Sequence, residues 1–210
     1  GKQSEYASEM DKSHLEIYAE AVQDLRNGND EIAIRKLIED GWSNGEEEFL
    51  VGQIMSMQLV NYQKAEQYYL KAVEKKVAKA KFNLAVLYDE KLENFKMAEK
   101  FYQLAIDEGD TNAIHNLALM YASKIKDFRK AEQYYLLAIK VGNVSALNNL
   151  AMLYERELQE VGKAKQYYLE AGRKGHINAI FNLALLYEKR CDDIDNAVRY
   201  YLMAADQGHI

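Results

Sequence analysis

The chain has 210 residues, of which 49% are hydrophobic and 29% charged, a balance typical of a soluble globular protein with a sizeable core. The net charge of -6 is unevenly distributed, because residues 1–60 carry 5 Lys and Arg against 13 Asp and Glu. An acidic first third disfavours nucleic acid and anionic membrane surfaces as partners. No apolar run is long enough to cross a bilayer, so we expect no membrane insertion.

Cysteine usage gives little information about the compartment. Cys191 is the only cysteine, so a disulfide within the chain is impossible and nothing marks an oxidising environment. The compartment stays open. The cytoplasm is slightly favoured, and an export signal removed ahead of Gly1 is the alternative.

The first 44 residues show helical signals but no clear repeat. Residues 1–12 are polar without periodicity and predict a frayed lead-in. Residues 13–44 carry apolar side chains at helical spacing on both sides of the turn signal at 27–30. We interpret this region as a degenerate N-terminal capping helix pair, as terminal units of repeat proteins often are.

From about residue 45 the sequence repeats every 33 residues. The run Asn116-Leu117-Ala118 with Tyr121 leads to Ala131 and then Gly142, and the same residue types recur one period earlier and later. A fixed period of this length is the signature of a solenoid. We expect five repeats, at about 45–77, 78–110, 111–143, 144–176 and 177–210.

Each repeat predicts two helices, so the fold class is all-α. In the second helices, Ala, aromatic, Tyr, Ala and Ile-like residues follow a spacing that forms a single apolar stripe. The first helices are expected near 46–58, 79–91, 112–124, 145–157 and 178–190. The second helices are expected near 62–75, 95–107, 128–140, 161–173 and 194–206.

The turn after each second helix is marked by glycine. Gly109, Gly142, Gly175 and Gly208 stand where a left-handed residue closes a helix, a conformation that Gly adopts at little cost. Lys76 takes this place in the first repeat. We therefore expect that turn either to be strained by about 1 kcal/mol or to be built differently.

The last residues resemble the beginning of another repeat. Residues 208–210 copy the Gly-His-Ile lead-in found at 175–177, and no polar-faced cap follows. We expect either that the natural protein continues beyond Ile210 or that another chain covers this end, with self-association as one outcome.

The repeated motif resembles the Sel-one-like repeat, a relative of the tetratricopeptide repeat. Its pattern is A-x-x-x-L-[GA]-x-x-Y, then A-x-x-[YF]-Y-x-x-A, then Gly. Counted from Ala105, the Gly lies four residues on, Ala113 eight and Leu117 twelve, as in Sel-one-like repeats, whereas tetratricopeptide repeats usually place Pro in that turn. The Gly-x-Gly insertion between the helices is missing, so tetratricopeptide-like is a fair second name.

This resemblance implies an architecture and a function. The expected fold is a right-handed α/α superhelix of about six helix pairs, whose first helices line a concave face. Members of the family mostly scaffold protein–protein contacts, so we expect a non-enzymatic protein that binds a peptide or partner protein on that face. The alternative is a structural or assembly spacer within a longer chain that associates through its open C-terminal end.

A recurring asparagine is the sharpest candidate for ligand contact. It precedes the repeated leucine at Asn83, Asn116, Asn149 and Asn182. In tetratricopeptide repeats this position faces the groove, where an amide both donates to and accepts from a peptide backbone. A ladder of four amides would suit an extended peptide. The alternative is that each Asn ties its helix to the next repeat and binds nothing.

Other groove candidates flank this ladder. They are Lys79, Phe82, His115, Asn148 and Phe181. Lys79 with Asn83 and Asn116 resembles the carboxylate-gripping set of some tetratricopeptide domains. Ser145 and Asn149 stand where that set has Lys and Arg, which disfavours recognition of a C-terminal carboxylate.

No motif indicates catalysis, a metal or a cofactor. The four histidines are scattered, and no pair has the spacing of a helical metal site. A phosphate-binding Gly-rich loop, a nucleophile elbow and a paired-Cys ligand set are all missing from the sequence. We therefore expect neither a cofactor nor a catalytic residue.

Overall fold

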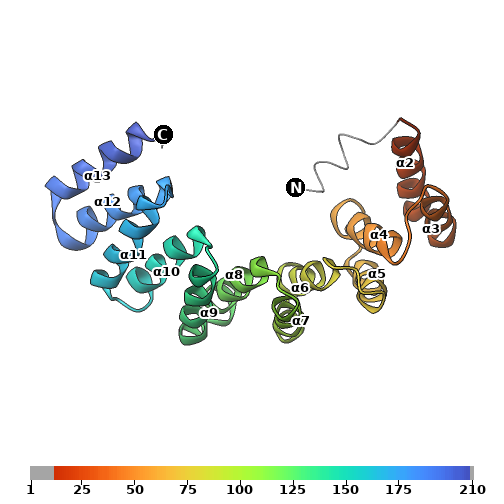
Figure 1. Ribbon diagram of the computed structural model, residues 1–210, viewed down its shortest axis with the longest axis horizontal. Coiled ribbons are helices and arrows are strands. Elements are labelled where there is room, and N and C mark those ends of the chain that lie inside the picture. Colours follow the sequence, from red (N-terminus) through yellow and green to blue (C-terminus); the bar gives the residue numbers. More distant parts are fainter. Residues whose placement is uncertain (1–11, 209–210) are drawn as a thin grey trace. The chain divides into compact units, whose positions relative to one another are not determined.

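A computed structural model describes residues 12–208 and divides the chain into two compact units, residues 1–105 and 106–210 (Figure 1). Over residues 12–208 the structure contains α-helices and one short π-helical segment, with no strand. The predicted lead-in lies outside the described residues, except that Lys12 already begins the first helix. His209 and Ile210 are also outside them.

The first unit is built from a run of helices joined by short connections. They are α2 (Lys12–Arg26), α3 (Asp30–Glu39), α4 (Glu46–Met57), α5 (Tyr62–Glu74), α6 (Ala80–Glu90) and α7 (Phe95–Asp107), whose last turn passes residue 105. The closest packing joins helices that are neighbours in sequence, such as α2 with α3, α4 with α5, and α5 with α6.

The second unit continues the same alternation. Its elements are α8 (Thr111–Met120), the π-helical segment η1 (Tyr121–Ile125), α9 (Phe128–Lys140), α10 (Val144–Arg156), α11 (Val161–Arg173), α12 (Ile177–Cys191) and α13 (Ile194–Asp206). Here too α10 packs on α11 and α12 on α13, while α9 and α11 contact the helix that follows.

These elements confirm the predicted all-α solenoid of helix pairs. The second helices α5, α7, α9, α11 and α13 begin and end within one residue of their predicted bounds. The first helix of the third repeat, α8, differs from its prediction, because its last residues form η1 and not an α-helix. There the backbone N–H of Lys126 donates to the Tyr121 carbonyl, five residues back.

The core explains why small and aromatic residues recur. The repeated first-helix alanines, Ala118 and Ala151 among them, are fully buried. Next to them the first-helix tyrosine stacks on a second-helix ring, with centroids 5.6 Å apart for Tyr154 and Tyr167. Small residues allow the two helices to approach, and the aromatic rings fill the remaining space. The tyrosines at these positions are therefore part of the core.

The connection between the two helices of a repeat contains a motif that sequence analysis missed. One residue in each such connection has a positive φ, although none of them is Gly: Val60, Glu93, Lys126, Gln159 and Asp192. The next residue caps the second helix in four repeats. For example, Asp127 accepts a hydrogen bond from the Lys130 N–H at 3.1 Å.

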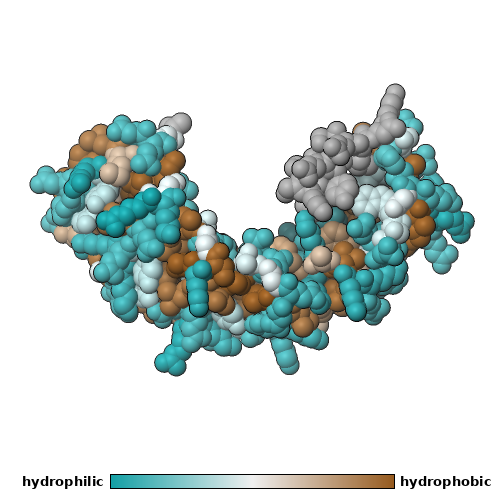
Figure 2. All heavy atoms as spheres, viewed as in Figure 1, coloured by the Kyte–Doolittle hydropathy of each residue, from teal (hydrophilic) through white to brown (hydrophobic). Residues whose placement is uncertain are grey.

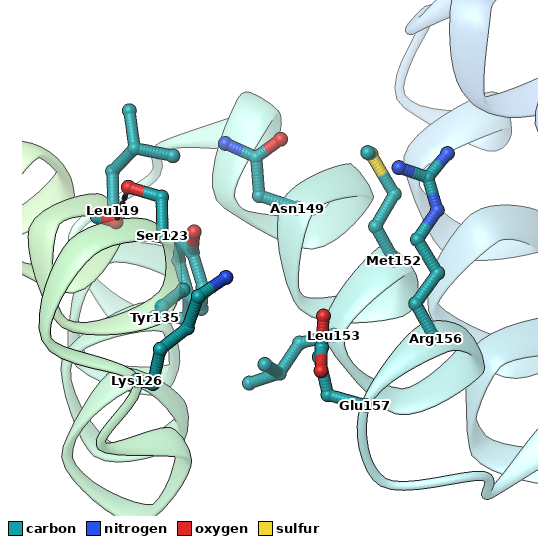
Figure 3. A pocket seen from close by; sticks show the side chains of 10 residues that line it. Leu119, Ser123, Lys126, Tyr135, Asn149, Met152, Leu153, Arg156 and Glu157 are labelled. Atoms are coloured by element: carbon teal, nitrogen blue, oxygen red, sulfur yellow. Dashed lines mark hydrogen bonds between the residues drawn. The ribbon is translucent and has the colours of Figure 1, made fainter.

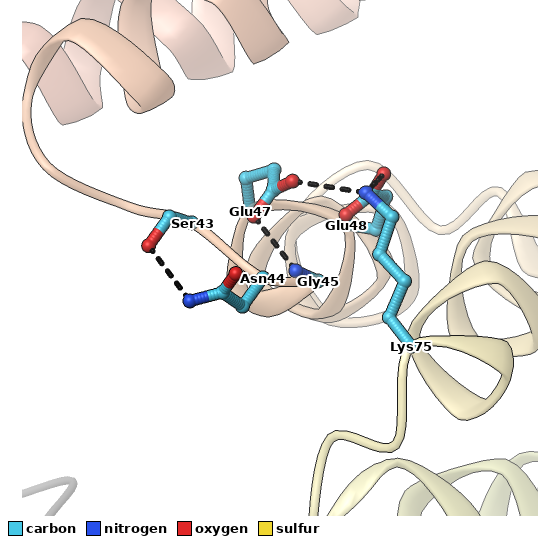
Figure 4. Close-up of polar contacts among 6 residues, drawn as sticks. All are labelled: Ser43, Asn44, Gly45, Glu47, Glu48 and Lys75. Atoms are coloured by element: carbon cyan, nitrogen blue, oxygen red, sulfur yellow. Dashed lines mark hydrogen bonds and ion pairs between the residues drawn. The ribbon is translucent and has the colours of Figure 1, made fainter.

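An acidic pair at the start of α4 is held by Lys75 from the end of α5 (Figure 4). Lys75 Nζ lies 3.1 Å from Glu47 and 2.5 Å from Glu48. Burial works to raise the pKa of Glu47, but hydrogen bonds from the backbone at the helix start and from Lys75 hold that pKa below its usual value. Gly45 makes the approach possible, because a Cβ there would lie 2.7 Å from the Cβ of Lys75.

Lys76 occupies the turn position that glycine holds in the later repeats. Its φ is 62°, in the left-handed region, and the equivalent Gly109 and Gly142 each have φ 91°. The turn is therefore built like the others, with a side chain in a conformation that costs an L-residue about 1–2 kcal/mol. The first of the two expectations for Lys76, a strained turn, is confirmed.

We expect Lys76→Gly to raise the free energy of unfolding by about 0.5–1 kcal/mol, because relief of strain exceeds the extra chain entropy of unfolded Gly. Urea denaturation followed by circular dichroism measures this. Gly142→Lys is the control and should lower stability by a similar amount, since a Cβ there meets no atom within 4 Å. A Gly variant no more stable than the parent chain would contradict the assignment of strain.

Candidate peptide-binding face

The predicted asparagines all lie on first helices and are half-buried. Asn83 belongs to α6 in the first unit, and Asn116, Asn149 and Asn182 belong to α8, α10 and α12 in the second. In the second unit, each first helix therefore presents one Asn at the same repeat position. We call the surface around these three residues the Asn face.

Two of these amides link neighbouring repeats. Asn149 Nδ2 lies 2.9 Å from His115 Nε2, and Asn182 Nδ2 donates to Asn148 Oδ1 at 3.0 Å. Each link joins a first helix to the first helix before it. At two positions the Asn side chain thus ties repeats together, but to the preceding repeat and not, as the structural alternative expected, to the next one.

The other two amides have no such link. Asn83 and Asn116 have no side-chain hydrogen-bond partner within the described part of the chain. Asn149 and Asn182 use only the amide nitrogen in their links, and their amide oxygens have no partner among the described residues. Peptide contact by the ladder stays a prediction, and the second unit has the free polar groups for it.

The flanking candidates are mostly part of the repeat packing. Three of them lie with their rings against a second-helix tyrosine, at centroid distances of 6.3 Å for Phe82 with Tyr102, 6.2 Å for His115 with Tyr135 and 5.4 Å for Phe181 with Tyr201. Asn148 is only 8% exposed. Lys79, at the start of α6, is exposed. Ligand contact by these residues also stays a prediction.

A pocket of ≈ 200 Å³ opens on the Asn face between α8, α9 and α10 (Figure 3). It is lined by Leu119, Ala122, Ser123, Lys126, Tyr135, Asn149, Met152, Leu153, Arg156 and Glu157. Asn149 is the one predicted site residue among them. Leu119 and Met152 follow Asn116 and Asn149 by three residues, so helical spacing would have placed them on the same face.

The pocket wall combines an apolar floor with polar groups. Burial raises the pKa of the Tyr135 hydroxyl to about 12, so this group stays a neutral donor. Burial also lowers the pKa of His115, which keeps its ring neutral and lets Nε2 accept from Asn149. Lys126 and Arg156 bring two positive charges to the rim and Glu157 one negative charge. The local charge therefore favours an anionic group.

Within residues 12–208, no group of three or more His, Cys, Asp or Glu is placed to hold a metal ion. No helix in the same range is long and apolar enough to cross a membrane.

The profile of the Sel1 (Sel-one-like) repeat matches residues 47–77, 144–176 and 177–209. The profile of the tetratricopeptide repeat matches 78–108 and 111–141, between the first Sel1 repeat and the other two. The chain is a protein of Sel1 and tetratricopeptide repeats. The predicted resemblance is thus confirmed, including its intermediate character. A comparison with curated proteins found no match.

Solved structures share this fold. The Sel1 repeat protein from Oxalobacter formigenes is 26% identical over 91% of this chain and 83% of its own, with a TM-score of 0.59. PilF of Pseudomonas aeruginosa is 19% identical over 94% of each chain, with a TM-score of 0.63. YrrB, described as a tetratricopeptide repeat protein with an unusual peptide-binding site, is 20% identical over 84% of this chain and 92% of its own, with a TM-score of 0.57.

The burial of His115 predicts that the second unit loses stability in acid. Because burial lowers the pKa of His115 in the folded state, the unfolded chain binds a proton more readily. The stabilisation is complete above the unfolded pKa of about 6.5 and is lost as pH falls through the folded pKa. We expect urea denaturation to show this loss as pH falls below the unfolded pKa of about 6.5.

His115→Phe is the matched variant, because Phe82 and Phe181 occupy the same position in other repeats. The variant should remove this part of the pH dependence, and an NMR titration of the parent chain should give a His115 pKa below the usual value. Equal pH slopes for the two proteins would show that His115 does not titrate in this way.

Proposed function

We propose that this repeat protein is a non-enzymatic scaffold that binds an extended segment of a partner protein along the Asn face. Sel1 and tetratricopeptide repeats generally mediate protein–protein interaction. The finer assignment is supported by one observation above all. The pocket opens beside Asn149, and Asn116 on the preceding first helix has no side-chain partner among the described residues.

The mechanism we infer is backbone recognition by amides combined with side-chain selection by the pocket. An extended peptide presents a donor and an acceptor at regular intervals, and an Asn amide matches both. The exposed Leu119 and the half-buried Met152 supply apolar area on either side. We further propose that residues 13–44 act as an N-terminal cap for five repeats over residues 45–210.

Replacement of the amides tests this function. Peptides selected from a random twelve-residue library on the parent protein would be measured by fluorescence anisotropy. We expect Asn116→Ala with Asn149→Ala to weaken binding more than tenfold, which is about 1.4 kcal/mol, because peptide backbone groups lose their partners. Asn116→Ala alone should leave stability unchanged, since that amide has no partner in the described chain.

Gln133→Ala is the control, because Gln133 is an exposed amide on the second helix α9. It should leave peptide affinity unchanged. Equal affinity of the Asn double variant and the parent protein would remove the Asn face from the proposal, and selected peptides that bind elsewhere would do the same.

A second candidate function rests on α13. Ile194, Val198 and Leu202 lie four residues apart and are 55%, 49% and 61% exposed, and apolar atoms gather over this helix (Figure 2). Glu132, at the position equivalent to Val198, binds Tyr154 of the following repeat. Since Val198 is apolar, we propose that this stripe packs against a second copy of the chain.

We expect Val198→Glu with Leu202→Glu to lower the average mass seen by light scattering, because two charges would be buried in a self-associated form. Val161→Glu would be unsuitable as a control, because Val161 begins α11, another helix of the repeat stack. Glu170→Gln, an exposed change on α11, is suitable. A parent chain that stays monomeric at high concentration would rule out this candidate.

A further inference from the structure

The second-helix tyrosine has a carboxylate partner in three repeats, in two of which it is buried and in the last of which it is half-buried. In each case the partner stands thirteen residues earlier, on the first helix of the same repeat. The pairs are Tyr102 with Asp89 at 3.0 Å, Tyr168 with Glu155 at 2.7 Å and Tyr201 with Glu188 at 2.5 Å. The repeat thus has a standard way to satisfy this hydroxyl.

The third repeat lacks that carboxylate. Ala122 stands at the position of the acid, and Tyr135 has no hydrogen-bond partner among the described residues, although its side chain is only 2% exposed. Ala122 and Tyr135 both line the pocket of ≈ 200 Å³. The pocket therefore lies where the carboxylate would be, with the Tyr135 donor in its wall (Figure 3).

The first repeat also lacks the acid, and its Tyr69 likewise has no hydrogen-bond partner among the described residues. Ser56 stands at the position of the acid, and the Tyr69 ring packs directly against Gly52, where a Cβ would lie 2.7 Å from Tyr69 Cδ1. The third repeat has Ala118 in place of this Gly. Its tyrosine ring cannot come as close to the first helix, and the space beside it remains open.

We propose that this pocket receives the carboxylate of a glutamate side chain from the bound partner, which accepts the hydrogen bond of Tyr135. The proposal rests on the function proposed above and names the side chain that the Asn face selects. The partner's glutamate takes the place that Glu155 fills for Tyr168 in the following repeat. Two of the three carboxylates that serve this tyrosine within the chain are glutamates.

The surroundings suit an ionised acceptor. Tyr135 remains a neutral donor at physiological pH, and hydrogen bonds to charged acceptors are about twice as strong as neutral ones. Lys126 and Arg156 have no ion-pair partner among the described residues and outnumber Glu157 at the rim. Asn149, in the same wall, is placed to hold the backbone of a segment whose side chain enters the pocket.

A pair of peptides tests the proposal. A library-selected peptide, acetylated and amidated at its ends, would be made with Glu and with Gln at the pocket position. We expect Gln to weaken binding to the parent protein about tenfold. Tyr135→Phe should abolish the difference between the two peptides. Ala122→Glu should also abolish it, because an intrachain carboxylate then fills the site.

Tyr168→Phe is the matched control. It removes the same kind of tyrosine–carboxylate bond one repeat later, so it should lower stability and leave the Glu-to-Gln difference unchanged. A difference that persists in Tyr135→Phe would overturn the proposal, as would a peptide that needs only a free C-terminal carboxylate. Peptides that depend on the asparagines but not on Glu would overturn this inference and leave the proposed function intact.

A second measurement needs no selected peptide. The protein with ¹³C-labelled tyrosine would be titrated with acetyl-glutamate amide and, separately, with acetyl-glutamine amide. We expect the Tyr135 resonance, assigned by its loss in Tyr135→Phe, to shift in a saturable way with the glutamate compound only. Equal shifts with both compounds, or no shift with either, would overturn the proposal.

Discussion

The contact between a small first-helix residue and a buried second-helix tyrosine is the constraint on which this fold depends. Ala151 allows the ring of Tyr168 to enter between the helices, where the side chain is fully buried. Burying the hydroxyl of such a ring without a partner would offset about 1–3 kcal/mol of the stabilisation that the ring contributes. At Tyr168 the repeat supplies an acceptor as well as space, because Glu155 accepts the hydrogen bond of the hydroxyl.

Periodicity made the architecture predictable, because each element depends on residues close in sequence. The stripe of α9 and the glycine at 142 carry the signals for a helix and its end. The strained turn at Lys76 could be predicted for the same reason, since the later repeats show which backbone conformation the position requires. The order of Sel1 and tetratricopeptide repeats along the chain follows from the same local patterns.

The parts that were missed depend on partners far apart in sequence or on small backbone changes. The tie between Asn149 and His115 spans 34 positions. The Asn ladder could therefore be found in the sequence, but not the fact that its ties run to the preceding repeat. The π-helical segment η1 has no marker residue in the sequence. Ala122 could have been noticed, because Asp89, Glu155 and Glu188 stand at the same position in other repeats. That an acid at this position accepts a hydrogen bond from the second-helix tyrosine could be known only from the structure.

Because the repeats are alike, the fourth repeat serves as an internal control for the site of the third. His115 connects Tyr135 to Asn149, since its ring lies 6.2 Å from that of Tyr135 and its Nε2 lies 2.9 Å from the Asn149 amide nitrogen. Neighbouring helices thus fix the donor in the pocket and the amide at its edge before any ligand arrives. A site held in this way avoids part of the ordering cost of binding, whereas the corresponding groups of the fourth repeat are already satisfied by Glu155 and Asn182. Selective recognition would then come from the one repeat of the second unit whose own sequence leaves its tyrosine without an acceptor among the described residues.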